Sequence, residues 1–374
     1  AASDVYKRQD LIRAVYANPL IHVSHGATIT DVSGYLGNFV TTVKTEGRVK
    51  KIKHGAAVLA IGADEYKPTE YLYGENDQVF THLELGEQIA QGHETVINAK
   101  NLVMIQCVGS RNEDHNYCSR VCCSHAVKNA LKLKELNPEM NIYILFRDMR
   151  TYGLREDAYR EASEKEVRFI RYEPDDKPVV EAVQEGGKPV LRVTVPDPIL
   201  GQRIELDADI VSLAAAVLPS ASTKEVAGQF KVTLSPDEFF KEAHVKLRPV
   251  EFAAEGVYLC GTAHYPKHIP ETINQAYGAA GRVLTLLSHD TVTASGSVCV
   301  VNENDCVSCG ACISACTYDA IDFIDTPKGI KAWVNPVLCK GDGLCNAKCP
   351  TNAIVLKHFT DESLLNQIDA AEFN

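Results

Sequence analysis

The sequence predicts an α/β protein that ends in a small cysteine-rich domain. Its 374 residues suffice for two or three domains of ordinary size. In the middle of the chain, short apolar runs alternate with helical patterns, which is typical of α/β folds. The cysteines are concentrated in two short stretches. No apolar run reaches the roughly 18–20 residues that a membrane span requires.

The thirteen cysteines and the net charge of −11 restrict the function classes. An acidic chain is a poor partner for nucleic acid on electrostatic grounds. Four cysteines lie in residues 107–123, eight lie in residues 299–349, and Cys260 stands alone. Dense clusters in a large chain favour metal ligation in a reducing compartment over a disulfide framework. We therefore expect a cytoplasmic metalloprotein.

The first lobe is expected to begin with antiparallel hairpins. Residues 1–9 (AASDVYKRQ) resemble translated adapter sequence and are set aside, so the natural protein would begin further upstream. Residues 20–53 alternate in polarity between glycine-rich turns, as hairpin strands do. Within them, the basic run at residues 48–54 is explained by a solvated strand face. Residues 56–63 resemble a short buried strand that ends in a glycine turn.

The second lobe, residues 98–222, is expected to be Rossmann-like. A strand at 102–105, a helix at 124–136 and a strand at 142–146 form a βαβ pattern. We expect a doubly wound sheet that continues through strands near residues 168–172, 190–195 and 210–213.

The chain is then expected to return to the first lobe through a buried strand at 256–261 and a helix at 271–287. Pro270 suits the first turn of this helix, and its apolar residues Ile273, Tyr277, Ala280 and Leu284 share one face. The expected organisation is a first lobe at 10–97 and 223–290, a second lobe at 98–222, a linker at 291–297, a cysteine-rich domain at 298–358 and a tail helix at 359–374.

The cysteine-rich domain is an internal duplication. The run Cys306-x2-Cys309-x2-Cys312-x3-Cys316 recurs 33 residues later, with Asp342 in place of one cysteine. This spacing is that of α+β bacterial two-cluster ferredoxins, in which three cysteines of a run hold one [4Fe–4S] cluster and the fourth reaches the other. A structural zinc site is the alternative, but zinc motifs rarely show this spacing.

The repeat predicts which residues hold each cluster. The first cluster is expected to use Cys306, Cys309, Cys312 and Cys349. The second is expected to use Cys316, Cys339 and Cys345, with Asp342 at the remaining corner. A carboxylate can bind that iron weakly or leave the corner open, so we expect the second cluster to be prone to conversion to [3Fe–4S].

A cysteine-rich loop stands where a nicotinamide-binding lobe has its phosphate-binding glycine turn. No G-x-G-x-x-G occurs anywhere in the chain. We expect the loop to hold a third [4Fe–4S] cluster through Cys107, Cys118, Cys122 and Cys123. A redox-active pair at Cys122-Cys123, a zinc site with His115 or His125, and inert buried thiols are the alternatives. Cys260 is expected to be a small core residue.

Four sequence blocks resemble those of the family of A-type heterodisulfide reductase subunits. QCVGSRNEDHNYCSRVCCSHAVKNA at 106–130 resembles the family signature, and blocks at 147–153, 239–250 and 259–276 follow in the family's order. The resemblance implies a partial thioredoxin-reductase-like FAD domain, interrupted by the Rossmann-like lobe and followed by the ferredoxin domain. It also implies an oxidoreductase subunit that distributes electrons through FAD, often by bifurcation.

The resemblance further implies partners and flavin contacts. A hydrogenase, formate dehydrogenase or NADH-oxidising subunit would donate electrons, and ferredoxin and B/C-type subunits would accept them. Lys267 is a candidate polar partner of the flavin ring, with a solvated loop lysine as the alternative. Contacts with FAD are implied for Gly37 and Asn38, for Ala60, Gly62 and Ala63, for Gly261 and Thr262, and for the helix that starts at Glu271.

One departure from the family pattern leaves other functions open. The family's N-terminal part, with its pyrophosphate-binding turn, does not precede residue 10 here, so we expect this chain to be the C-terminal portion of a longer FAD protein. An electron-wiring or docking subunit with clusters but no flavin chemistry is one alternative. An NAD(P)H-dependent relative of thioredoxin reductase is another, although it needs a glycine turn and a C-x-x-C in the second lobe, and the sequence has neither.

Overall fold

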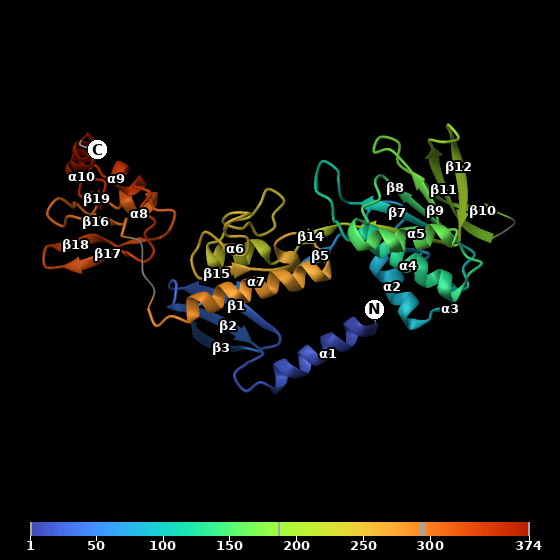
Figure 1. Ribbon diagram of the computed structural model, residues 1–374, viewed down its shortest axis with the longest axis horizontal. Coiled ribbons are helices and arrows are strands. Elements are labelled where there is room, and N and C mark those ends of the chain that lie inside the picture. Colours follow the sequence, from blue (N-terminus) through green and yellow to red (C-terminus); the bar gives the residue numbers. More distant parts are fainter. Residues whose placement is uncertain (1, 186–187, 292–295, 373–374) are drawn as a thin grey trace. The chain divides into compact units, whose positions relative to one another are not determined.

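The computed structural model describes residues 2–185, 188–291 and 296–372 (Figure 1). The chain divides into two compact units, a larger one at 58–282 and a smaller one made of 1–57 and 283–374. None of the helices in the described ranges combines the length and apolar character needed to cross a membrane.

The larger unit is built on a five-stranded sheet. Every neighbouring pair in it is parallel. Leu102 to Ile105 are fully buried, as expected of a strand covered on both faces. The strands lie in the order β6 (Val79–Thr81), β13 (Ile210–Ala215), β7 (Asn101–Val108), β8 (Asn141–Phe146) and β9 (Arg168–Arg171).

Helices cover one face of this sheet (Figure 1). Leu133 of the middle helix, α4 (Cys122–Leu136), and Met104 of β7 belong to the same buried core. The middle helix begins at Cys122, directly after the cysteine-rich loop, so the loop lies where β7 passes into the helix. The helices are α2 (His82–Gln91), α4 (Cys122–Leu136) and α5 (Glu156–Glu164).

An antiparallel sheet covers the other face. Its buried Leu191 packs in one core with Val103 of β7. The expectation that the strand near residues 190–195 continues the parallel sheet is therefore wrong. Residues 179–208 alternate in polarity, which suits a sheet with one solvated side better than a crossover helix. The strands are β10 (Val179–Glu185), β11 (Lys188–Asp197) and β12 (Gln202–Ala208).

Two strands bring distant segments of the larger unit together. β4 (Ala57–Leu59) pairs with β15 (Val257–Leu259), and the N–H of Cys260 donates to the carbonyl of Leu59 at 3.2 Å. The turn that follows β4 therefore lies next to the turn that follows β15. The other elements of this unit are α3 (Glu94–Ile97), β5 (Ala63–Glu65) paired with β14 (Val217–Pro219), α6 (Thr223–Phe230), and the short 3-10 turns η1 (Gly153–Arg155) and η2 (Gly261–Ala263).

The helix expected at 271–287 is present as α7 (Ile269–Leu287). The apolar face noted in the sequence is exposed: Ile273 is 48%, Tyr277 74% and Leu284 67% accessible. The periodic pattern thus predicted the helix correctly, and that face is uncovered among the described residues.

In the smaller unit, the expected hairpins are confirmed. β1 (Ala27–Ser33), β2 (Phe39–Thr45) and β3 (Arg48–His54) form an antiparallel sheet, and β3 is largely exposed, as its basic sequence predicted. The N–H of Asn38 donates to the carbonyl of Tyr35 at 2.7 Å. This closes a turn whose third residue, Gly37, has φ +80°. Helix α1 (Ala2–Ala17) precedes the sheet.

The cysteine-rich domain shows the duplication in its backbone. Gly310 and Gly343 precede α8 (Ala311–Ala315) and α9 (Leu344–Lys348) with φ values of 75° and 76°. Residues 292–295 of the expected linker lie outside the described residues, and the tail helix is α10 (Asp361–Glu372). The strands are β16 (Cys299–Val301) paired with β19 (Ile354–Leu356), and β17 (Ile321–Thr326) paired with β18 (Gly329–Val334).

Candidate functional site

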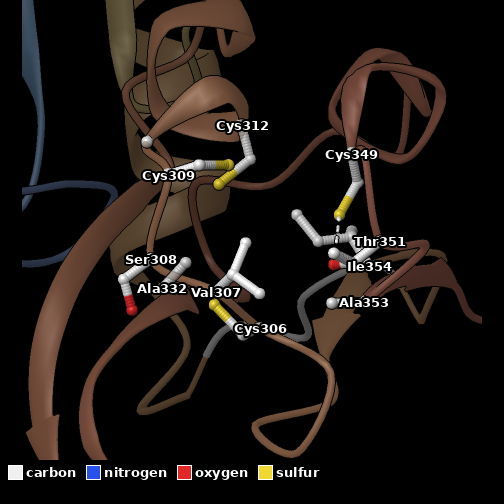
Figure 2. Close-up of a pocket in the computed structure, with 11 residues that line it drawn as sticks. Cys306, Val307, Ser308, Cys309, Cys312, Ala332, Cys349, Thr351, Ala353 and Ile354 are labelled. Atoms are coloured by element: carbon white, nitrogen blue, oxygen red, sulfur yellow. Dashed lines mark hydrogen bonds between the residues drawn. The ribbon is translucent and has the colours of Figure 1, made fainter.

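Four thiols line one pocket in the cysteine-rich domain, as Figure 2 shows. Three come from the first run and the fourth from the end of the second run, as the spacing predicts. Burial opposes ionisation of Cys349, but hydrogen bonds from Thr351 prevail and lower its pKa. Four thiols around one pocket are the donor set of a [4Fe–4S] cluster. They are Cys306, Cys309, Cys312 and Cys349.

The thiols expected at the second cluster lie around a cysteine to which the spacing assigns no role. The Sγ atoms of Cys345 and Cys299 are 3.4 Å apart, and the backbone N–H of Cys299 donates to Sγ of Cys339 at 3.4 Å. Sγ of Cys316 accepts the N–H of Ala320 at 3.3 Å. These contacts gather Cys339 and Cys345, but through Cys299 rather than through the expected carboxylate.

Asp342 occupies the position that the repeat predicts. Its backbone lies directly before Gly343, as Cys309 lies before Gly310. The side chain is exposed, and its Oδ1 accepts the N–H of Leu344 at 3.2 Å. The carboxylate therefore stabilises its own turn.

In the larger unit, the loop between β7 and α4 brings the other four cysteines together. A hydrogen bond with Cys123, burial, and the nearby thiols Cys107 and Cys118 raise the pKa of Cys122. Sγ of Cys118 accepts the N–H of Arg120 at 3.3 Å. The thiols of Cys107, Cys118 and Cys123 thus all lie near enough to Cys122 to influence its ionisation.

The backbone of this loop is unusually constrained. Cys107, Arg111 and Arg120 adopt left-handed φ values of 63°, 57° and 60°, each at a cost of about 1–3 kcal/mol. Gly109 has φ +73°, and a Cβ there would lie 2.2 Å from the ring of Tyr66. Such conformations persist only where the surroundings fix them, and they cluster at functional sites.

Arginines surround the same thiols. Nη1 of Arg111 lies 3.9 Å from Sγ of Cys107, while its Nη2 donates to Asp148 at 2.6 Å. Arg147 donates twice to the carbonyl of Arg111, each time at 3.0 Å. Burial raises the pKa of Cys107, and the charges of Arg111 and Arg147 oppose that rise. Nε of Arg147 is buried without an acceptor, so a further acceptor such as a cluster sulfur fits beside Cys107.

The histidines of the loop have protein partners. Nδ1 of His115 lies 2.9 Å from the carbonyl of Gly109, and the ring of His125 packs edge-on to His82. Burial, reinforced by Lys128, lowers the pKa of His125 to about 4. Among residues 2–185, 188–291 and 296–372, no three His, Cys, Asp or Glu side chains form a group suited to a single metal ion.

Arg120, between Cys118 and Cys122, ties the cysteine loop to the start of α7. Its guanidinium donates to the carbonyl of Pro266 at 3.0 Å and to the hydroxyl of Tyr152 at 2.8 Å. It also forms an ion pair of 2.6 Å with Glu271. Burial works against ionisation of Glu271, yet the N–H of His268 and the charge of Arg120 lower its pKa.

Comparison with known proteins identifies this arrangement. The 4Fe-4S dicluster domain family matches residues 305–353. The A-type iron-sulfur subunit of the CoB--CoM heterodisulfide reductase of Methanocaldococcus jannaschii is 37% identical over 335 residues, which are 85% of this chain and 50% of that protein. The chain belongs to the family of A-type heterodisulfide reductase subunits. The resemblance seen in the sequence is thereby confirmed, together with a ferredoxin-type domain after an α/β region.

A second member of this family extends the comparison. The A-type subunit of the H(2)/formate:CoB-CoM heterodisulfide,ferredoxin reductase of Methanococcus maripaludis is 36% identical over 334 residues, or 85% of this chain and 50% of that protein. The chain thus spans about half the length of the curated relatives it matches. Among solved structures it is similar to thioredoxin reductase of T. acidophilum, with 13% identity, a TM-score of 0.49, and coverage of 76% of this chain and 81% of that one.

The flavin contacts that the family resemblance implies are partly occupied within the protein. The N–H of Gly261 donates to Oε1 of Gln275 at 2.9 Å, and the carbonyl of Gly261 accepts from Nζ of Lys267 at 2.7 Å. Lys267 is only 9% exposed, so the alternative of a solvated loop lysine is wrong. Burial, reinforced by Arg120, lowers the pKa of Lys267 to about 8.

The other residues implied to contact FAD differ in how much space the structure leaves beside them for a ligand. Gly62 has φ +80°, and a Cβ there would meet nothing within 4 Å. The Nε2 of His268, in the loop before α7, is buried without a partner. Thr262 is half-buried in η2, and Ala60 and Ala63 flank Gly62 after β4. Gly37 and Asn38 form their turn in the smaller unit. An open glycine and an orphaned buried nitrogen fit a bound cofactor such as FAD.

Two residues of these sites were not predicted from the sequence. Arg120 stands between two candidate ligands in the family signature, but the partners of its guanidinium lie far away in the sequence, so no local signal reveals its bridging role. Cys299 lies outside the repeated run, and its relevance becomes visible only once β16 is placed beside the second run.

Proposed function

We propose that this chain is the iron–sulfur and flavin-linked electron-transfer portion of an oxidoreductase of the A-type heterodisulfide reductase family. The observation that carries the proposal is the Arg120 bridge. Through it, the loop with Cys118 and Cys122 is held against the segment from Pro266 to Glu271, which follows the Gly261 motif implied to bind FAD. A cluster and a flavin held by these two segments would be neighbours, as electron transfer requires.

The residues have distinct roles in this proposal. Cys107, Cys118, Cys122 and Cys123 hold a [4Fe–4S] cluster, and two further clusters belong to the ferredoxin domain. Arg111 and Arg147 place positive charge near Cys107 and so favour the reduced, more negative cluster. FAD, when bound, converts between two-electron and one-electron exchange. Buried Lys267 holds the Gly261 turn in place through its hydrogen bond.

The partners follow from the relatives' names. Those names specify hydrogen or formate, the CoB-CoM heterodisulfide and ferredoxin. We propose that a hydrogenase, formate dehydrogenase or NADH-oxidising subunit donates electrons. Ferredoxin and B/C-type subunits accept them, by flavin-based bifurcation. All thirteen cysteines are free thiols in the structure, which suits the proposed cytoplasmic location.

An anaerobic electron-transfer assay tests the proposal. The full chain is reconstituted with iron, sulfide and FAD, reduced, and mixed with oxidised ferredoxin, while iron is counted. We expect about twelve irons per chain and rapid reduction of ferredoxin. Cys118→Ser removes about four irons and slows the transfer from flavin. Cys260→Ser, at a buried cysteine outside every run, changes neither. Equal rates in the two variants would contradict the proposal.

A second candidate, an electron-wiring subunit without flavin chemistry, is favoured by one observation. Both backbone groups of Gly261 already have protein partners, Gln275 and Lys267. A flavin titration distinguishes the two functions. Saturable FAD binding that is weakened by Gly62→Val, where a side chain would fill open space, supports the flavoprotein. Iron-loaded chain that reduces ferredoxin but binds no FAD supports the wiring subunit.

A further inference from the structure

Cys299 lies outside the repeated cysteine runs, yet the fold carries it into the second of them. It begins β16, which pairs with β19 so that Cys299 faces Leu356 across the ladder. The side chain is 2% exposed. Its sulfur touches Sγ of Cys345 at 3.4 Å, and its N–H reaches Sγ of Cys339 at 3.4 Å. Cys299 therefore contacts two of the three thiols expected at the second cluster.

The internal repeat gives an independent reason to connect Cys299 with a cluster. The 33-residue offset that relates Cys306 to Cys339 relates Cys299 to Ala332. Ala332 lines the pocket formed by the first set of four thiols (Figure 2). The position equivalent to Cys299 in the other half thus faces a cluster pocket. In the first half this position holds the thiol of Cys299, and in the second half it holds the methyl group of Ala332.

Among the four repeated ligand positions, the two runs differ at one. The first half has Cys309 where the second has Asp342. The second run has therefore lost a thiol, whereas the residue that lies against it from the first half, Cys299, carries one. The carboxylate of Asp342 is exposed and bound to the N–H of Leu344, whereas the thiol of Cys299 is buried against Cys345. Iron–sulfur clusters are held by thiolates in preference to carboxylates.

We propose that Cys299, rather than Asp342, is the fourth ligand of the second cluster in the ferredoxin domain. Binding replaces the S–H bond of Cys299 with an S–Fe bond and releases one proton to solvent, with no change of oxidation state. The ligand set becomes Cys299, Cys316, Cys339 and Cys345, so both clusters of this domain have four thiolates. The inference rests on the proposed iron–sulfur function, and it removes the reason to expect a [3Fe–4S]-prone second cluster.

The test uses the full chain, reconstituted without oxygen, with iron counting, Mössbauer spectra and EPR of the oxidised protein. Wild type is expected to show only [4Fe–4S] clusters. Cys299→Ser is expected to lose about one iron per chain and to show the EPR signal of a [3Fe–4S] cluster. Asp342→Ala is the matched control, and it is expected to keep the full iron content.

A double variant keeps the test decisive if Cys299→Ser loads poorly. Cys299→Ser/Asp342→Cys returns the thiol to the repeated position and is expected to restore the missing iron. An unchanged spectrum in Cys299→Ser, or loss of iron in Asp342→Ala, would overturn the assignment. Wild-type chain without any cluster in this domain would instead contradict the proposed function, so the two failures are distinguishable.

Discussion

Arg120 and Glu271 are 151 residues apart in the sequence, and their side chains form an ion pair of 2.6 Å. Arg120 belongs to the cysteine-rich loop, and Glu271 lies in the first turn of α7. The same carboxylate accepts the N–H of His268 at 2.8 Å. One side chain thus closes the N-terminal end of α7 and anchors the cysteine loop to it.

Glu271→Gln is expected to loosen this connection. Both side chains are partly exposed, so the ion pair contributes no more than about 1 kcal/mol, and the melting temperature should fall by about 2–4 °C. Because the pKa of Glu271 lies below its ordinary value of 4.5, its stabilisation is present above that pH and is lost as the pH falls through the folded value. Calorimetry measures both effects. Glu135→Gln, in the exposed pair with Lys132, is the control and should change little.

Lys267→Met is expected to change how stability depends on pH. The folded protein releases the Lys267 proton near pH 8, whereas the unfolded chain holds it until about 10.5. Wild type should therefore gain about 1–3 kcal/mol relative to the variant as the pH rises through this window. Urea unfolding of both proteins between pH 7 and 10 measures the difference. Parallel curves for the two proteins would show that Lys267 titrates normally.

Gly109→Ala is expected to displace the cysteine loop. The new Cβ would lie 2.2 Å from the ring of Tyr66, at a φ of +73°. We expect the chain to lose about four irons, measured by iron counting after reconstitution. Tyr66→Ala in the same chain should restore part of the iron by making room. Gly92→Ala has the same φ with open space around it, and iron loss there would show that the effect is not specific to the loop.

Gly34→Ala is expected to destabilise the sheet of the smaller unit. A Cβ at Gly34 would lie 2.0 Å from the carbonyl oxygen of Asn38, in a backbone with φ +95°. The strain should cost about 2–3 kcal/mol, against about 1 kcal/mol for Gly47→Ala, where φ is +81° and no atom is near. Limited proteolysis and thermal unfolding compare the two variants. Equal losses would mean that the contact with Asn38 relaxes freely.

Local spacing predicted the parts of the site that depend on short stretches of chain. Cys306, Cys309 and Cys312 lie close together in the sequence. The internal repeat predicted that Cys349 joins them at one site, and the structure shows all four lining one pocket. The hairpins at residues 27–54 follow from alternation and glycine turns in the same way. Signals of this kind survive folding because the residues that carry them are already neighbours.

Relationships between distant segments could not be predicted. The contact of Cys299 with Cys345 depends on the pairing of β16 with β19, and the burial of Lys267 depends on the packing around the Gly261 turn. The strand predicted near residues 190–195 belongs to an antiparallel sheet rather than to the parallel one, because a single strand-like run does not reveal its partners. Tertiary pairing decides these features, and it leaves little trace in local sequence.

The left-handed backbone of the cysteine loop has a consequence for the speed of electron exchange. Cys107, Arg111 and Arg120 are each held in a conformation that tolerates little adjustment, and Arg147 fixes the carbonyl of Arg111. Dipoles and charges that are already in place cost no rearrangement when charge arrives. A cluster in this loop would therefore have a small reorganisation energy, because its ligands would move little when the cluster is oxidised or reduced.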